Sequence, residues 1–240
     1  MRKLILAYIK FLWRSTNQHG VHSPFVYDLV TKCFYDKKDY SDYHKLKNYK
    51  RDLLKNKDTI EVTDLGVGSQ VMKTKQRVIA RIAKNAGTTP KRAKMLYRLM
   101  RYLNINSTLE LGTSLGIGTY TMSLSSPNGH VTSIEGCPNI SSFTKQQLKD
   151  HDVSNANLLV GDFSEVIKDL KDTSFDMIFI DGNHDKDATI EYFNQLISKT
   201  HNETVIIFDD INWSRGMQEA WQTKIAFPEV TVSIDTFFWG

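Results

Sequence analysis

Cysteine is scarce in this chain of 240 residues, which contains only Cys33 and Cys137. The two lie in unrelated contexts and form no Cys-x-x-Cys pair, which argues against a disulfide framework and against a cysteine-based zinc site. A reduced environment is the simplest interpretation of such sparse cysteine. We therefore expect a cytoplasmic protein.

Long hydrophobic runs are also missing. The longest one near the N-terminus, Leu4–Ile9, is far shorter than the ~20 apolar residues that a membrane-spanning helix needs, and Lys10 and Arg14 add charge directly after it. No small-residue cleavage site comes after it, so we expect neither a membrane span nor a signal peptide. A content of 40% hydrophobic and 24% charged residues is instead typical of a globular protein.

The whole chain has a small net charge, but its two halves have large net charges of opposite sign. The net charge is +4. Residues 1–107 contain 23 Lys and Arg against 8 Asp and Glu, which gives +15, and residues 108–240 contain 8 against 19, which gives −11. Mutual attraction of the halves, or a solvated basic face, would explain this asymmetry. A basic surface for an anionic substrate, nucleic acid included, is the functional alternative.

The glycine-rich stretch after Thr108 lacks the Gly-x-Gly-x-x-Gly spacing of dinucleotide dehydrogenases. Its glycines have the pattern Gly-x-x-x-Gly-x-Gly, at Gly112, Gly116 and Gly118. The apolar run Thr108–Leu111 predicts a strand and Tyr120–Leu124 predicts the start of a helix, so the loop would bring a ligand close to bare backbone. Glu110, inside the strand, suits a ligand with a cationic end. The alternative is an ordinary strand-to-helix turn with glycines for tight packing.

Carboxylates mark the ends of five apolar runs. The first run is Thr108–Leu111, which contains Glu110. The other four runs are Gly129–Glu135, Asn157–Asp162, Phe175–Asp181 and Thr204–Asp210. Packing does not require an acid at the end of a strand, whereas ligands of open α/β sheets bind outside the carboxyl ends of the strands. Glu135 also lies 23 positions after Gly112, close to the roughly 20-residue offset at which an acid meets ribose hydroxyls.

These residues, taken in order, resemble the class I S-adenosylmethionine-dependent methyltransferases, in particular bacterial O-methyltransferase-like members with a helical N-terminal extension. The matching pattern is Leu109-Glu110-Leu111-Gly112-Thr113-Ser114-x-Gly116, then Glu135, then Gly161-Asp162, then Asp181-Gly182-x-His184. The resemblance covers Asn106–Gly240 and implies S-adenosylmethionine as the cofactor. It implies that the methionine part is held by Glu110, Gly112, Thr113, Ser114 and Gly116, the ribose by Glu135 beside Gly136, and the adenine by Asp162 and Phe163, with Asp181 facing the methyl group.

The fold class that we expect is α/β, with a Rossmann-like, doubly wound and mostly parallel sheet, because strands alternate with helices from Thr108 onward. We expect residues 106–240 to form the methyltransferase domain and residues 1–105 a basic, mainly helical extension or lid. Glu229–Phe238 is predicted as a sixth strand. The final antiparallel strand of the family then has no residues left, so we expect it to be missing or truncated, or the sheet to end differently at Phe237–Gly240.

The N-terminal part is predicted to be helical over Leu4–Trp13 and over Phe25–Tyr35, where Ser23 caps the helix and Pro24 begins it. Phe25, Leu29 and Phe34 are expected to face inward. The segment Asp36–Lys57 is predicted to be an exposed helix or a mobile connection. Two more helices are expected, over Gln76–Lys84 and Pro90–Leu103. The glycines after Asp64, in Asp-Leu-Gly-Val-Gly, resemble a first cofactor loop, but no strand ending in an acid comes next, so we reject it as the cofactor site.

Methyl transfer needs the donor and the nucleophile in line, and a hydroxyl nucleophile must also lose its proton. Asp181, Asp209 and Asp210 would meet at one edge of the sheet, and three carboxylates suit Mg²⁺, Ca²⁺ or Mn²⁺. This arrangement is similar to the cation-dependent O-methyltransferases of catechol type, which usually show Asp-Asn where this chain has Asp209-Asp210. His184, as a general base, is the second route to deprotonation. Asp181, His184 and Asp209 are therefore the predicted catalytic residues.

The leading prediction is O-methylation of a small molecule, with or without a divalent cation. Methylation of RNA or DNA by means of the basic N-terminal part is an alternative. It is weakened because the fourth acidic run ends in Asp-Gly-Asn-His, not in the Asn/Asp-Pro-Pro-Tyr sequence used on base amines. A cofactor-binding module without catalysis is the third. Trp213, close to Asp210 in the sequence, could equally line an aromatic acceptor or pack in the core.

Overall fold

The computed structural model describes residues 2–63, 74–85, 87–171 and 174–240, with side chains from Ile5 onward. At its centre lies a sheet of five strands in the order β5-β4-β3-β6-β7, and every neighbouring pair is parallel. The strands are β3 (Ser107–Leu111), β4 (His130–Glu135), β5 (Ala156–Val160), β6 (Met177–Ile180) and β7 (Val205–Phe208). All five match predicted apolar runs, so the expected doubly wound parallel sheet is confirmed.

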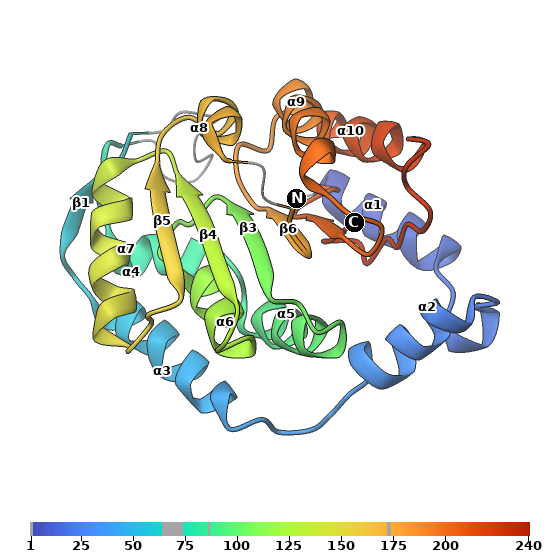
Figure 1. Ribbon diagram of the computed structural model, residues 1–240, viewed down its shortest axis with the longest axis horizontal. Helices are drawn as coiled ribbons and strands as arrows, with labels where there is room; N and C mark the ends of the chain where they lie inside the picture. The colour runs from blue at the N-terminus through green and yellow to red at the C-terminus, as the bar shows by residue number, and fades with distance from the viewer. Residues whose placement is uncertain (1, 64–73, 86, 172–173) are drawn as a thin grey trace.

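Helices cover both faces of this sheet (Figure 1). They are α3 (Asp42–Lys55), α4 (Ile79–Asn85), α5 (Pro90–Tyr102), α6 (Ile117–Ser125), α7 (Pro138–Asp150), α8 (Phe163–Asp169), α9 (Lys186–Leu196) and α10 (Arg215–Ile225). Buried side chains of α3, α4, α6 and α7 share one apolar cluster, whereas those of α8 and α9 pack in a different one with Phe208 of β7. The apolar strand residues are therefore covered on both sides, as a parallel sheet requires.

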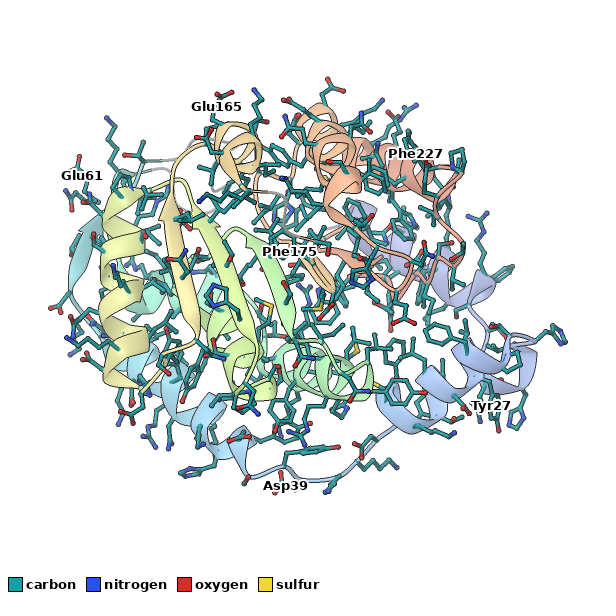
Figure 2. All side chains as sticks on the ribbon, viewed as in Figure 1. Tyr27, Asp39, Glu61, Glu165, Phe175 and Phe227 are labelled. Atoms are coloured by element: carbon teal, nitrogen blue, oxygen red, sulfur yellow. The ribbon has the colours of Figure 1, made fainter. Side chains whose placement is uncertain are left out.

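Side chains fill the space between the sheet and its helices (Figure 2). Phe175, just before β6, is buried in the interior, whereas Tyr27, Asp39 and Glu61 lie exposed at the periphery. No helix within the described residues is both long enough and apolar enough to cross a membrane.

The N-terminal helices form where the sequence predicts them, but one predicted inward residue is wrong. The elements are α1 (Arg2–Arg14), the 3-10 turn η1 (Gln18–Gly20), α2 (Pro24–Asp28) and the π-helical η2 (Leu29–Phe34). The Ser23 hydroxyl caps α2 and Pro24 begins it, as predicted. Leu29 is buried and Phe34 packs against the same cluster. Phe25 is exposed because it lies in the first turn, before the chain reaches the sheet.

The segment predicted as an exposed helix or a mobile connection is an amphipathic helix with a buried face. In α3, Tyr43, Leu46, Tyr49 and Leu53 are buried. Two of these are tyrosines, whose hydroxyls bond to other elements, which is why a count of aliphatic residues alone underestimates the burial of this helix. The predicted helix Gln76–Lys84 also needs correction, since Gln76–Val78 is strand β2, antiparallel to β1 (Thr59–Glu61), and α4 begins only at Ile79.

The predicted sixth strand over Glu229–Phe238 is wrong, because this segment has no regular secondary structure. Local hydrogen bonds shape its end instead. The Asp235 carboxylate accepts the Phe237 N–H, and the Thr236 hydroxyl accepts the Trp239 N–H. The chain then returns to the sheet, where Gly240 and Phe208 exchange both backbone hydrogen bonds, at 2.9 and 3.1 Å. This reciprocal pattern is antiparallel, so the sheet ends differently at Phe237–Gly240, which was one of the two expectations.

The division into residues 1–105 and 106–240 stays a prediction. The apolar clusters contain residues from both ranges: Leu96, Leu99 and Met100 of α5 pack with Met177 and Phe179 of β6. The glycine stretch after Asp64, rejected as the cofactor site, lies outside the described residues.

Candidate active site

A pocket lies at the carboxyl ends of β3 and β6, where the sequence places the cofactor. It encloses about 250 Å³ of space, part of it open to solvent. Its lining consists of Gly87, Thr88, Glu110, Gly112, Thr113, Ser114, Leu115, Ile117, Gly118 and Asp181. Five predicted site residues, Glu110, Gly112, Thr113, Ser114 and Asp181, meet here.

Gly112 allows two strand ends to approach closely. Its φ is +103°, and a Cβ atom there would collide with the carbonyl group of Asp181. The Asp181 N–H in turn donates to the Leu111 carbonyl at 2.9 Å. Only glycine fits both the backbone angle and the contact. The predicted turn glycine therefore holds the first loop against Asp181.

Gly116 lies at the start of α6, outside the pocket lining, and its predicted role toward the cofactor stays a prediction. It begins α6 with φ +76°, and a Cβ atom there would collide with Thr144 and Tyr49. The same two side chains hold the loop: the Tyr49 hydroxyl donates to the Leu115 carbonyl at 2.8 Å and the Thr144 hydroxyl to the Ser114 carbonyl at 2.7 Å. The loop is therefore shaped by α3 and α7 before any ligand arrives.

Glu110 lies at the base of the pocket and is completely buried. The hydroxyls of Thr119 and Ser133 both donate to its Oε2 atom at 2.5 Å. Because Ser133 has only one hydroxyl hydrogen, Thr113, at 2.6 Å from it, donates to Ser133 in turn. Burial raises the pKa of Glu110 to about 7, against the lowering effect of the two hydroxyls. Such an acid would be stabilised in its charged form by a cationic ligand.

Glu135 lies at the end of β4 and is fixed by backbone. Its Oε2 accepts the N–H of Ser114 at 2.8 Å and its Oε1 accepts the N–H of Cys137 at 3.0 Å. Ser114 has a φ of +48°, which turns its N–H away from the helix and toward this carboxylate. Glu135 is thus joined to the first loop, and Gly136 comes next in a bend outside the pocket lining.

Asp162 and Phe163 lie at the start of α8, outside the pocket lining. Asp162 is exposed and caps the helix by accepting the Glu165 N–H at 3.4 Å. The Phe163 ring lies against Gly182, where a Cβ atom would be 2.7 Å from it. This contact places the ring next to the end of β6, beside Asp181.

Asp181 connects the pocket to a second group of side chains. Its Oδ1 lies 4.0 Å from Nε2 of His184. Burial, then the charge of Asp209 and a hydrogen bond with it, raises the pKa of Asp181 well above its usual value. Burial and the charge of Asp209 also raise the pKa of Asp210, while His184 and Arg92 act in the opposite direction. The predicted acids therefore meet at one edge.

Arg92 is the cation at this edge. Its Nη1 lies 3.0 and 3.1 Å from the two carboxylate oxygens of Asp209, and its Nη2 lies 3.3 Å from Oδ1 of Asp210. Asp209 is only 4% exposed. No group of three or more His, Cys, Asp or Glu side chains in the described ranges is arranged to hold a metal ion. The predicted metal ligands gather, but Arg92 occupies both oxygens of Asp209, so this arrangement does not fit a divalent cation.

Two exposed aromatic rings border the same edge. The Trp213 side chain is 44% exposed, and the backbone N–H of this residue donates to the backbone carbonyl of Asp210 at 2.8 Å. Phe238 is 43% exposed, and its ring centre lies 4.4 Å from the guanidinium carbon of Arg92. Of the two predicted roles of Trp213, core packing is therefore wrong.

Sequence reasoning missed Arg92, Tyr49 and Thr144. All three come from helices outside the strand-end pattern on which the prediction was based. A signal for Arg92 existed, because Thr89-Pro90 predicts a helix start that places Arg92 in the first turn, and three clustered carboxylates need a cation nearby. No comparable signal identifies Tyr49, whose partner is a backbone carbonyl.

A glycine loop, an acid at the end of the second strand and further strand-end acids on a parallel sheet are the features by which this chain resembles the class I S-adenosylmethionine-dependent methyltransferases. In this chain, residues 109–211 match a family model described as "Methyltransferase domain". The matched range contains every predicted cofactor-binding residue. The resemblance inferred from the sequence is confirmed.

Solved methyltransferase structures share the fold. The O-methyltransferase TomG from Streptomyces achromogenes, involved in tomaymycin synthesis and solved with SAM, is 17% identical, with 81% of each chain covered and a TM-score of 0.56. An O-methyltransferase from Bacillus cereus, solved with SAH, is 20% identical, with 84% of this chain and 85% of that one covered and a TM-score of 0.54. The SAH-bound methyltransferase PaMTH1 from Podospora anserina is 12% identical, with 87% and 89% covered and a TM-score of 0.60. No curated protein matches the chain significantly in sequence.

Proposed function

We propose that this protein transfers the methyl group of S-adenosylmethionine to an oxygen atom of a small molecule. The observation that carries the proposal is the placement of two acids, from β3 and β4, beside one glycine loop. Glu110 is buried at the base of the pocket, and Glu135 is hydrogen-bonded to the loop at Ser114. The first suits the ammonium group of the cofactor's methionine part and the second suits its ribose hydroxyls.

The cofactor would supply an activated methyl group on sulfur, and the chain would supply alignment. Asp181 lines the pocket and also contacts the second group of acids, so it lies between the cofactor end and the acceptor end. His184, 4.0 Å from Asp181, would accept the proton of an acceptor hydroxyl. Phe163, against Gly182, would lie beside the adenine.

The acceptor that fits this edge is a small molecule with an apolar or aromatic body. Trp213 and Phe238 present exposed rings there, next to Asp210 and Arg92 respectively. The structural relatives named above include two O-methyltransferases, which supports oxygen as the acceptor atom. Nucleic acid is the second candidate, supported by the +15 charge of residues 1–107. Retention of the protein on RNA that falls steeply with salt would support it.

The test is calorimetric titration of S-adenosylhomocysteine into the wild type and the Glu135→Ala variant. Loss of a charged hydrogen bond to the ribose should weaken binding by roughly 1.5–3 kcal/mol. Glu203→Ala, at an exposed site, is the matched control and should bind like the wild type. Melting temperatures of all three proteins show whether the variants are folded. Absence of binding in the folded wild type would refute the proposal and favour a module without catalysis.

A further inference from the structure

The acceptor end of the site, where Asp181, Asp209 and Asp210 lie, contains a positively charged side chain of the protein. Asp181, Asp209 and Asp210 come from the ends of β6 and β7. Arg92, from the first turn of α5, is hydrogen-bonded to two of them, Asp209 and Asp210. Arg92 and Asp209 are 117 positions apart in the chain. This ion pair is therefore a long-range tertiary contact and not a contact between neighbours on one helix.

Arg92 is held from several directions. Two hydrogen bonds fix its guanidinium to Asp209 and a third fixes it to Asp210, while the Phe238 ring lies against its face at 4.4 Å. The Arg92 backbone is anchored as well, since its N–H donates to the Thr89 hydroxyl at the start of α5. The side chain is 19% exposed and that of Asp209 is 6% exposed. Paired charges with so little exposure do not separate readily, because each would be left buried alone.

A divalent ion would have to compete for the same oxygens. Mg²⁺ and Ca²⁺ bind through several oxygen ligands at short range, and both oxygens of Asp209 already accept from Arg92. The ion would therefore have to displace the guanidinium from Asp209.

We propose that Arg92, and not a divalent metal ion, is the resident cation of this site. It offsets part of the negative charge of Asp209 and Asp210 and holds both side chains in place through its hydrogen bonds. Within the described residues, its side chain makes three hydrogen bonds, and a guanidinium has five N–H donors. The remaining donors suit an acceptor oxygen that gains negative charge as its proton leaves. This last role rests on the proposed function, whereas the identity of the cation does not.

The test is Mn²⁺ binding to the full chain after treatment with EDTA and dialysis, measured by the loss of the free-ion electron paramagnetic resonance signal. The wild type should bind no ion at this site. Arg92→Ala should uncover the carboxylates and bind one Mn²⁺ at ion concentrations at least about tenfold below any at which the wild type takes up the ion, because buried acids without a cation attract another one. Arg92→Ala combined with Asp209→Asn should lose that gain. Lys91→Ala removes the same charge from the exposed neighbouring position and should behave like the wild type.

Stoichiometric Mn²⁺ binding by the wild type that is lost in Asp209→Asn would overturn the proposal, as would an Arg92→Ala variant that is folded and gains no ion. If Arg92→Ala fails to fold, Arg92→Gln takes its place in the same comparison. Titration of S-adenosylhomocysteine with and without EDTA keeps the two proposals apart. Absence of binding in both cases would refute the methyltransferase proposal, while the Mn²⁺ comparison would still decide the role of Arg92.

Discussion

Glu110 and Asp209 are both buried acids, but their surroundings differ. Asp209 is paired with the guanidinium of Arg92. Within the described residues, the side chains that donate to Glu110 are the hydroxyls of Thr119 and Ser133, which are neutral. Burial therefore dominates at Glu110 and raises its pKa to about 7. A buried acid of this kind makes the stability of the free protein depend on pH.

The direction of that dependence comes from the two pKa values of Glu110, the ordinary 4.5 and the raised value of about 7 in the folded chain. Between them the folded state keeps a proton that the unfolded state has lost, so the free energy of unfolding should fall as pH rises through this range and level off above it. A shift of this size corresponds to roughly 3 kcal/mol. Glu110→Gln should remove that part of the slope. Urea unfolding of both proteins at about pH 5 and about pH 8 measures it, and equal slopes would contradict the prediction.

At the residue scale, the acids of the site could be predicted but their partners could not. Glu110, Glu135 and Asp209 can be found with one rule, that ligands bind at the carboxyl ends of parallel strands. The helix start at Thr89-Pro90 places Arg92 in the first turn of α5, but its pairing with Asp209 depends on how α5 lies across the sheet, which no local pattern specifies. The roles of the individual residues toward the cofactor stay predictions.

At the scale of elements, α3 supports the glycine loop that follows β3. Its Tyr49 is buried and donates to the Leu115 carbonyl at 2.8 Å, and its ring stacks on Tyr120 of α6 at 4.6 Å. One hydroxyl thereby joins helix α3 to the glycine loop that follows β3.

Tyr49→Phe should remove that hydrogen bond and leave the ring packing intact. We expect the free energy of unfolding to fall by about 1 kcal/mol, the usual net contribution of one hydrogen bond, and somewhat more because the carbonyl is left buried. Chemical denaturation measures the change. The control is Tyr27→Phe, which removes the same atom from an exposed ring. Equal effects of the two substitutions would show that Tyr49 does not support the loop.

The central strands were predictable as elements, and the last segment was not. A parallel strand covered on both faces is a short continuous apolar run, which is easy to recognise between helices. The segment after α10 has alternating Val230, Val232 and Ile234, the pattern of a half-buried strand. The turn that Asp235 and Thr236 form before Trp239 decides its structure instead.

At the scale of the whole molecule, the end of the described chain holds two parts together. Phe237 packs against Tyr8 and Phe11 of α1, with ring centres 4.9 and 5.5 Å apart. Trp239 inserts into the apolar cluster of α5 and β6, 5.8 Å from the Phe179 ring. Figure 1 shows α1 beside this C-terminal segment.

Trp239→Ala should destabilise the whole fold, because it leaves a large cavity in this cluster, at a typical cost of about 3–5 kcal/mol. Trp239→Phe should cost much less, since the Nε1 atom of Trp239 is buried without a hydrogen-bond partner among the described residues and its removal forfeits no bond. Thermal unfolding of the two variants gives the comparison. An alanine variant as stable as the phenylalanine variant would show that the ring is not anchored in the core.

The position of the Arg92–Asp209 ion pair in the chain also has a consequence for the order in which parts of the protein fold. Contacts between residues far apart in a chain form late, because a long loop must close first. Helix α5 is synthesised well before β7, so Arg92 reaches Asp209 only when the last strand has paired with β6. The glycine loop, β4 and β6 can come together earlier, since their contacts span shorter stretches of chain. A newly made protein would therefore acquire the pocket beside its glycine loop first and the Arg92–Asp209 pair last, so that the proposed acceptor site would be complete only in the completely folded chain.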